Sequence, residues 1–167
     1  AQDSNGRAES IFVTAKQQNY PTLVRFSQKY VSDTMVNETN IFFDEDQDEY
    51  DRSYGAVKRF TMRQNFMRVF QELRVGNVPV GQSVIQTADG KQVVGQSDST
   101  INNIQYYAQI YGIGDAAWSL ASENYADYFI DTNRGVWCRV SLDGITPISV
   151  LYGTNTFWNL KLPYYNK

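Results

Sequence analysis

Residues 125–150, YADYFIDTNRGVWCRVSLDGITPISV, contain two polar turns between three runs of strand-forming residues. One turn ends in Gly135 and the other ends in Gly144. Short runs rich in Val, Ile, Tyr, Phe and Trp that are separated by such turns are typical of antiparallel hairpins. We therefore expect strands at residues 125–130, 136–141 and 145–150.

The same pattern extends over the rest of the chain, although less sharply. Asp89-Gly90 lies between two apolar runs and predicts a tight hairpin turn. Asp115 is a candidate N-cap for a short helix at residues 115–122, whereas residues 101–111 fit a strand slightly better than a helix. The tail, residues 154–167, is aromatic and predicted to be irregular, and residues 29–40 are predicted to form a long connection. Further strands are expected at residues 11–14, 22–27, 66–70, 75–80, 83–86 and 92–94.

These segments predict a mostly β fold, built from antiparallel hairpins that resemble β-propeller blades, with one or two short helices. Glycines that end polar turns are expected to adopt the positive φ that other residues avoid. The glycines expected to do so are Gly76, Gly90, Gly135 and Gly144.

Two segments of the chain align when it is shifted by 59 residues. Residues 65–76 then fall on residues 124–135, with Phe66 on Tyr125 and Phe70 on Phe129. Either the chain repeats one hairpin, as a propeller does, or the match between two ordinary hairpins is a coincidence. Propeller blades usually recur every ~40–50 residues, so a repeat of 59 residues would need an insertion. If the repeat holds, we expect the rings of Phe70 and Phe129 to pack inward. In that register Arg68 and Asp127 are expected on the opposite face and tolerant of substitution.

The composition favours a β protein that contacts a partner. Aromatic residues make up 14% of the 167 residues, which favours strands and contact surfaces. The net charge of −3 argues against tight nucleic-acid binding, which depends on Lys and Arg. The chain has no histidine, the commonest general base and metal ligand. The single cysteine, Cys138, lies in a predicted strand and is expected to be a core residue. We therefore predict no enzyme activity, no catalytic, cofactor or metal residues, and no bound cofactor.

Several motifs leave alternatives open. Asp44, Asp46 and Asp48 resemble the start of a calcium loop, but an EF-hand needs Gly and Glu where Glu49 and Gly55 stand. A solvated acidic loop at residues 44–51 is favoured over a looser cation site. Residues 112–114, Gly-Ile-Gly, lack the third glycine of a phosphate-binding loop. Carboxylate pairs could serve glycoside hydrolysis, but none stands out among 18 acidic residues.

The exposed tyrosines suggest a further alternative, a carbohydrate- or surface-binding β domain. Core or subunit contacts are the favoured roles for these rings. The residues concerned are Tyr106, Tyr107, Tyr125, Tyr128, Phe129, Tyr164 and Tyr165.

An ordered series of short segments between residues 21 and 153 resembles the muzzle proteins of crAss-like bacteriophages. The most similar part is residues 101–153, and no single segment is a strong motif. Its main segments are Ile104-Gln105-Tyr106-Tyr107, Tyr111-Gly112-Ile113-Gly114-Asp115, Tyr128-Phe129-Ile130-Asp131-Thr132-Asn133-Arg134-Gly135-Val136 and Arg139-Val140-Ser141-Leu142-Asp143-Gly144-Ile145-Thr146-Pro147-Ile148-Ser149. Upstream, Leu23-Val24-Arg25-Phe26-Ser27-Gln28, Tyr54-Gly55-Ala56-Val57, Val69-Phe70-Gln71-Glu72 and Val75-Gly76 are similar in order and spacing.

The chain departs from the family pattern at two places. Val150-Leu151 stand where the family tends to have an acidic residue before Tyr-Gly, and Ala116-Ala117-Trp118 stand where it usually has a proline. These departures fit a divergent relative or a piece of a longer protein.

The resemblance implies a structural component of the phage tail. Muzzle proteins form an oligomeric ring that closes the distal end of a short tail and gates DNA ejection, and the family offers no catalytic residues to transfer. The implied partners are further copies of the chain, other tail and ring proteins, and DNA that passes without sequence-specific binding; no membrane span is expected. The implied location is the virion. Because the family proteins are longer and this chain begins at Ala1 without Met, we expect residues 1–167 to be a single β-rich module, a fragment of a tail protein, with a frayed segment at residues 1–10.

Overall fold

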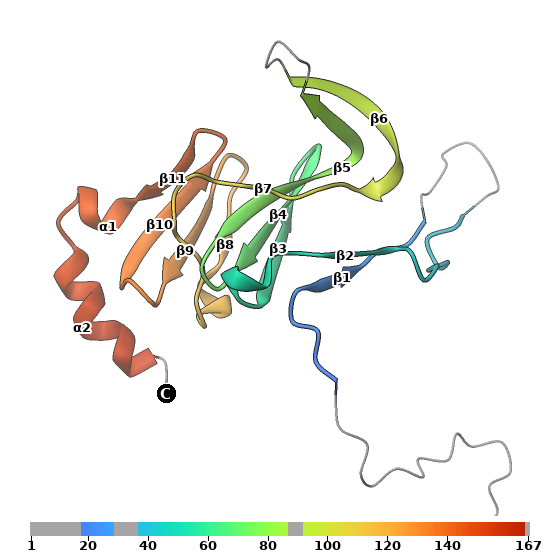
Figure 1. Ribbon diagram of the computed structural model, residues 1–167. Coiled ribbons are helices and arrows are strands. Elements are labelled where there is room, and N and C mark those ends of the chain that lie inside the picture. The colour runs from blue at the N-terminus through green and yellow to red at the C-terminus, as the bar shows by residue number, and fades with distance from the viewer. Residues whose placement is uncertain (1–17, 29–36, 87–91, 166–167) are drawn as a thin grey trace, which may run out of the picture.

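The computed structural model of the protein describes residues 18–28, 37–86 and 92–165. Within these ranges the chain forms three antiparallel sheets and two short α-helices (Figure 1). The prediction of a mostly β fold with antiparallel hairpins and few helices is confirmed. The strand predicted at residues 11–14, the turn at Asp89-Gly90 and residues 29–36 of the long connection lie outside the described residues.

The larger sheet is built around one long strand, β5 (Val75–Gln86). The first half of β5 pairs with β4 on one side and β7 on the other, and its second half pairs with β6. The β5–β6 hairpin curls away from the rest of this sheet (Figure 1). The other strands are β3 (Val57–Met62), β4 (Phe66–Gln71), β6 (Gln92–Ile101) and β7 (Gln105–Tyr106).

The second sheet is a four-stranded antiparallel meander in which each strand pairs with the next along the chain. Its register places Phe129 beside Cys138 and Val140 beside Ile145. The hairpin predicted from residues 125–141 is therefore confirmed, although its first strand begins at Asp127. The strands are β8 (Ala121–Ser122), β9 (Asp127–Asp131), β10 (Val136–Ser141) and β11 (Gly144–Pro147).

Strand β4 is buried on both faces because it lies between two layers. Successive side chains of a strand point to opposite faces. Phe70 packs with Phe129 and Val140 of the second sheet, whereas Val69 packs with Val78 toward the small sheet on the other side. That small sheet consists of β1 (Leu23–Arg25) and β2 (Gln47–Glu49).

Two helices, α1 (Ile148–Leu151) and α2 (Asn155–Tyr165), cover the outer face of the second sheet (Figure 1). The irregular tail predicted for residues 154–167 is therefore wrong, and the strand predicted for residues 145–150 ends at Pro147. Trp137, which points outward from β10, meets Trp158 of α2 with ring centroids 5.5 Å apart. Short helices form mainly through such packing, which local sequence does not reveal.

The helix predicted at residues 115–122 is reduced to one 3-10 turn, η2 (Ala117–Ser119). Ala116 occupies the capping position, so the prediction that Asp115 caps it is wrong. The carboxylate of Asp115 instead forms an ion pair with Lys58 of β3, with Nζ and Oδ1 3.1 Å apart. A second 3-10 turn, η1 (Arg52–Tyr54), precedes β3.

The glycine predictions are confirmed at Gly135 and Gly144, whose φ angles are 63° and 124°, and Gly90 lies outside the described residues. The prediction for Gly76 is wrong, because this residue is not among the described glycines with positive φ. It lies inside β5, where it pairs with Val69 of β4 and Tyr106 of β7. A Cβ at this position would lie 2.6 Å from the side chain of Ile104. Gly76 is therefore required for close packing, not for a turn.

Candidate functional site

A buried ion pair between Arg68 of β4 and Asp127 of β9 joins the two larger sheets. Arg68 is 1% exposed and Asp127 is fully buried. A buried charge is costly unless it is paired and hydrogen-bonded. This pair therefore needs further hydrogen bonds at the interface between the sheets.

Arg68 uses all five of its N–H donors. Nη1 donates to the Asp127 carboxylate and to the Val140 carbonyl oxygen (3.4 Å), and Nη2 donates to the Tyr107 hydroxyl (3.0 Å). The remaining bonds are from Nη2 to the Ser141 carbonyl oxygen (3.5 Å) and from Nε to Asn77 Oδ1 (3.3 Å). The desolvated guanidinium is thus saturated by partners from both sheets.

Asp127 also binds a second arginine. Arg63, which follows β3, donates from Nη2 to Asp127 Oδ1, and the hydroxyl of Thr61 donates to Asp127 Oδ2 (3.2 Å). Nη1 of Arg63 donates to the main-chain carbonyl oxygens of Glu123 and Asn124, the latter at 3.1 Å. Arg63 therefore connects the tip of the β3–β4 hairpin to the tip of the β8–β9 hairpin by hydrogen bonds.

The prediction that Arg68 and Asp127 lie on the opposite face from the packed rings is wrong. Side chains two residues apart on a strand share a face, so Arg68 lies on the same face as Phe70, and Asp127 lies on the same face as Phe129. The inward packing of Phe70 and Phe129 is confirmed: both are fully buried, and their rings meet edge to face with centroids 5.4 Å apart.

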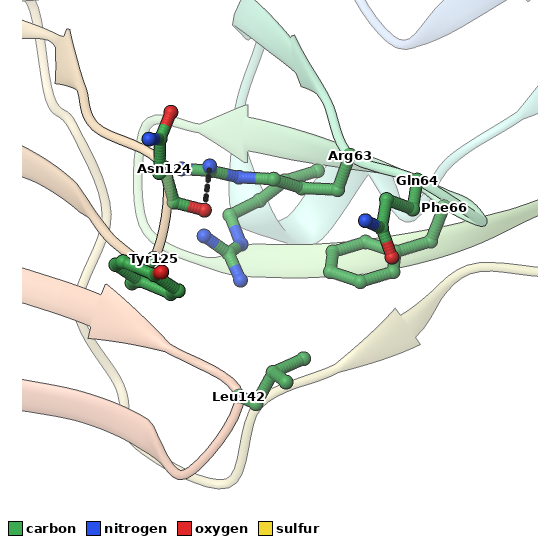
Figure 2. Close-up of a pocket in the computed structure, with 7 residues that line it drawn as sticks. Arg63, Gln64, Phe66, Asn124, Tyr125 and Leu142 are labelled. Carbon is green, nitrogen blue, oxygen red and sulfur yellow. Dashed lines mark hydrogen bonds between the residues drawn. The ribbon is translucent and has the colours of Figure 1, made fainter.

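The two hairpin tips and the β10–β11 turn enclose a cleft of about 260 Å³, which we call the hairpin-tip cleft (Figure 2). In Figure 2 the rings of Tyr125 and Phe66 lie on opposite sides of the cleft, with Leu142 below them. Tyr125 is 84% exposed and Leu142 is 78% exposed. The lining residues are Arg63, Gln64, Phe66, Arg68, Asn124, Tyr125 and Leu142.

A wider, more open cavity of about 580 Å³ shares a wall with this cleft. Arg63, Gln64, Asn124 and Tyr125 line both spaces. The second space adds Glu123, whose carboxylate accepts a hydrogen bond from the Tyr128 hydroxyl (3.3 Å). The hairpin tips thus present one cation, one carboxylate, two amides and one exposed ring to solvent.

The tyrosines singled out in the sequence are divided between interior and surface. The Tyr106 hydroxyl donates to Gln71 Oε1 (2.7 Å), and the Tyr107 hydroxyl donates to the Ser141 carbonyl oxygen (3.0 Å). Tyr125 lies in the cleft, and Tyr128 lies beside Trp137 on the outer face of the second sheet. Tyr164 and Tyr165 belong to α2.

Cys138 lies in β10 and is fully buried in the core between the sheets, as predicted. Burial raises the pKa of its thiol to about 12. A thiol with such a pKa is almost entirely protonated at neutral pH and is a poor nucleophile.

The acidic run at residues 44–51 is more structured than the solvated loop predicted for it. It contains β2, and Asp46 is buried. The carboxylate of Asp46 accepts hydrogen bonds from Gln28 Nε2 (2.7 and 2.8 Å) and from the main-chain N–H of Phe43 (2.7 Å). Over residues 18–28, 37–86 and 92–165, no three acidic or cysteine side chains are grouped as a metal site would require.

The Gly-Ile-Gly segment at residues 112–114 has a packing role. A Cβ on Gly112 would lie 2.3 Å from the main-chain oxygen of Glu72. The N–H of Gly114 donates to the same oxygen (3.0 Å). These glycines allow the segment to lie directly against the β4–β5 turn.

Sequence reasoning missed Arg63 and the hairpin-tip cleft. The available signal was that Arg68 and Asp127 lie among apolar residues in predicted strands, since buried charges are rare unless paired.

None of the helices in the described part of the chain is long and apolar enough to cross a membrane.

Comparison with known proteins identifies no relative: no protein-family model, no curated protein and no solved structure matches the chain.

Proposed function

We propose that this chain is a structural module of a bacteriophage tail, part of the oligomeric muzzle ring that closes the distal end and gates DNA ejection. The observation that supports it best is the face-to-face packing of two similar antiparallel units, β3–β4–β5 and β8–β9–β10, through a buried ion pair. Antiparallel units with open sheet edges can pair with further copies, so the two units are proposed to be parts of a larger assembly. The role proposed is assembly and not catalysis.

The surfaces left open by these units suit a protein that assembles. Among the described strands, β3 and β11 each have a hydrogen-bonded neighbour on one side only. Such edges favour pairing with another chain. Large apolar side chains are also exposed along α1 and α2 and the connection between them: Val150, Leu151, Tyr152, Phe157 and Leu160. In the proposed ring these side chains contact neighbouring subunits or other tail proteins.

Immunogold electron microscopy of the phage that encodes the chain tests this proposal. Antibodies against residues 18–165 should label intact particles at the distal end of the tail. Labelling of the capsid alone, or absence of the chain from purified particles by mass spectrometry, would contradict it.

The mild negative charge, −3 over the chain, suits a passage from which DNA must be released without tight binding.

A second candidate function is carbohydrate binding at the hairpin-tip cleft. The observation that favours it is the 84% exposed ring of Tyr125 beside the amides of Gln64 and Asn124. An aromatic face packs against the apolar face of a sugar ring, while amides bond to its hydroxyl groups. Chemical-shift changes at residues 63–66 and 124–126 on addition of sugars would support this function.

A further inference from the structure

We infer that the hairpin-tip cleft binds a sugar ring that carries a carboxylate group. The inference rests on the second proposed function, carbohydrate binding, and adds the charge of the ligand. It is carried by the charges, the hydrogen-bond donors and the shape of the cleft.

The groups that line the cleft or form an ion pair with its arginines carry two positive charges and one negative charge. Arg63 and Arg68 both bond to Asp127, so two guanidinium groups share one carboxylate. Glu123 is also nearby, but Arg63 contacts its main-chain oxygen, and the Glu123 carboxylate accepts from Tyr128 on the side of the wider cavity. One positive charge is therefore left over at a partly desolvated site, where a ligand anion is favoured.

The charged donors that remain belong to Arg63. A guanidinium has five N–H donors, and those of Arg68 are all used within the protein. Arg63 uses two donors on Nη1 and one on Nη2. Its Nε–H and its second Nη2–H bond to no residue that the structure describes. Two donors of one guanidinium match the two oxygens of a carboxylate.

The shape of the cleft favours a single ring-shaped ligand. Its volume of about 260 Å³ lies just below the ~300–1,000 Å³ typical of small-molecule sites. Tyr125 and Phe66 flank the space, the Gln64 amide lies beside Phe66 (Figure 2), and Asn124 also lines the cleft. A pyranose can place its apolar face on a ring and its hydroxyl groups on the amides.

A nucleic acid is a poorer fit for the same cleft. Phosphodiester chains are bound by tracks of several Lys and Arg residues, each of which contacts a phosphate. Here Arg63 is the only cation among the lining residues with donors to offer, and Glu123 lies on the adjoining surface. One leftover charge suits one carboxylate.

Binding can be measured by ¹H–¹⁵N NMR titration of the whole chain. The acidic probes are methyl β-D-glucuronide, galacturonic acid and N-acetylneuraminic acid, and the neutral probe is methyl β-D-glucoside. At least one acidic sugar should bind saturably, shift residues 63–66 and 124–126, and bind at least about 10-fold more tightly than the neutral glucoside. Arg63→Gln should remove that preference.

Tyr125→Ala tests the site independently, because a side chain that is 84% exposed can be removed without unfolding the protein. Tyr125→Ala should weaken binding of the acidic sugar about 10-fold. Gln64→Ala should weaken the same binding by a smaller factor. The matched controls are Arg139→Gln and Tyr152→Ala, which remove an exposed arginine and an exposed tyrosine elsewhere; both should bind as the unsubstituted chain does.

The outcomes separate the inference from the function on which it rests. Equal affinity for neutral and acidic sugars would overturn the carboxylate assignment and leave carbohydrate binding standing. Absence of binding by all four sugars would overturn both. Binding that persists unchanged in Arg63→Gln and Tyr125→Ala would show that the ligand lies elsewhere and would overturn the inference.

Discussion

Arg68 and Asp127 lie 59 residues apart in the chain and bond to each other between the two larger sheets. Phe70 and Phe129 have the same separation and also contact each other. At these two positions, a residue of one hairpin therefore contacts the residue at the equivalent position of the other hairpin. Residues near the axis of a two-fold symmetric contact behave in this way, so the two hairpins pack as an approximate two-fold pair would.

The glycines before each hairpin extend this correspondence. Gly55 and Gly114 are also 59 residues apart, and both have positive φ, 80° and 56°. Each lies against the first residue after the central strand of its unit: Gly55 against Glu72, and Gly114 against Thr132. The correspondence ends at the tips and turns, where Phe66 lies within β4 but Tyr125 precedes β9, and where Gly76 and Gly135 differ in conformation.

The first prediction concerns the buried carboxylate. Asp127→Asn leaves the guanidinium groups of Arg63 and Arg68 without their counter-charge. Breaking a buried pair in this way should lower the free energy of unfolding by about 3–5 kcal/mol, measured by urea denaturation. The control Asp143→Asn changes an exposed carboxylate in the β10–β11 turn and should alter stability by less than about 0.5 kcal/mol. Equal effects of the two substitutions would contradict a structural role for the pair.

The second prediction concerns the paired rings. Phe70→Ala and Phe129→Ala each empty a fully buried site and should each cost about 3–5 kcal/mol of unfolding free energy. Phe60→Ala, on the exposed face of β3, is the control and should cost far less. Because the rings touch, the double substitution should depart from additivity by about 0.5–1.5 kcal/mol. Strict additivity would mean that the contact contributes nothing beyond burial.

Much of the β framework could be predicted from local pattern. The turns at Gly135 and Gly144 combine polar residues with a glycine that adopts positive φ, and both predicted turns exist. The apolar residues of β10 alternate, so Val136, Cys138 and Val140 point inward. In contrast, α2 depends on packing of Trp158 against Trp137, which no local signal reports.

The candidate site could not be predicted because it depends on which strands face each other. Because side chains alternate between the two faces of a strand, Arg68 lies on the same face as Phe70. An arginine that is buried on that face requires an acidic partner. That the partner is Asp127, and that Arg63 joins it, follows from the packing of two sheets that are separate in sequence. The hairpin-tip cleft arises from that packing.

The third prediction concerns pH. Burial raises the pKa of the Cys138 thiol from 9.0 to about 12 in the folded protein. Between these values the unfolded chain releases the thiol proton and the folded chain keeps it, so unfolding is favoured as pH rises through this window. The contribution of Cys138 to stability is therefore complete below about pH 9 and declines above it.

Cys138→Ala should accordingly flatten the fall of unfolding free energy between about pH 9 and 10.5 relative to the unsubstituted chain. The folded protein should also resist alkylation by iodoacetamide at pH 8 and react once it is unfolded in urea. Rapid alkylation of the folded chain, or identical pH profiles for the two proteins, would contradict the buried thiol.

The last prediction concerns assembly through the α1–α2 surface. Leu151 and Leu160 are 67% and 66% exposed, and the proposed ring covers them with a partner. We expect the unsubstituted chain to form oligomers of defined size in light scattering, with the assembled fraction rising with concentration. Each leucine buried at a contact contributes roughly 1.5–3 kcal/mol, so Leu151→Ser with Leu160→Ser should weaken association at least about 100-fold.

A matched double substitution separates this surface from general loss of apolar area. Met62 and Leu142 are about as exposed as the two leucines, but Met62 lies at the end of β3 and Leu142 lies in the β10–β11 turn, both beside the hairpin-tip cleft. Met62→Ser with Leu142→Ser should therefore leave the oligomer intact. A monomer at every concentration would argue against self-assembly through this chain, and equal loss of assembly in both double variants would place the contact elsewhere. Because all four positions are largely exposed, neither variant should change the unfolding free energy by more than about 1 kcal/mol, so a change in oligomer size reports the contact and not the fold.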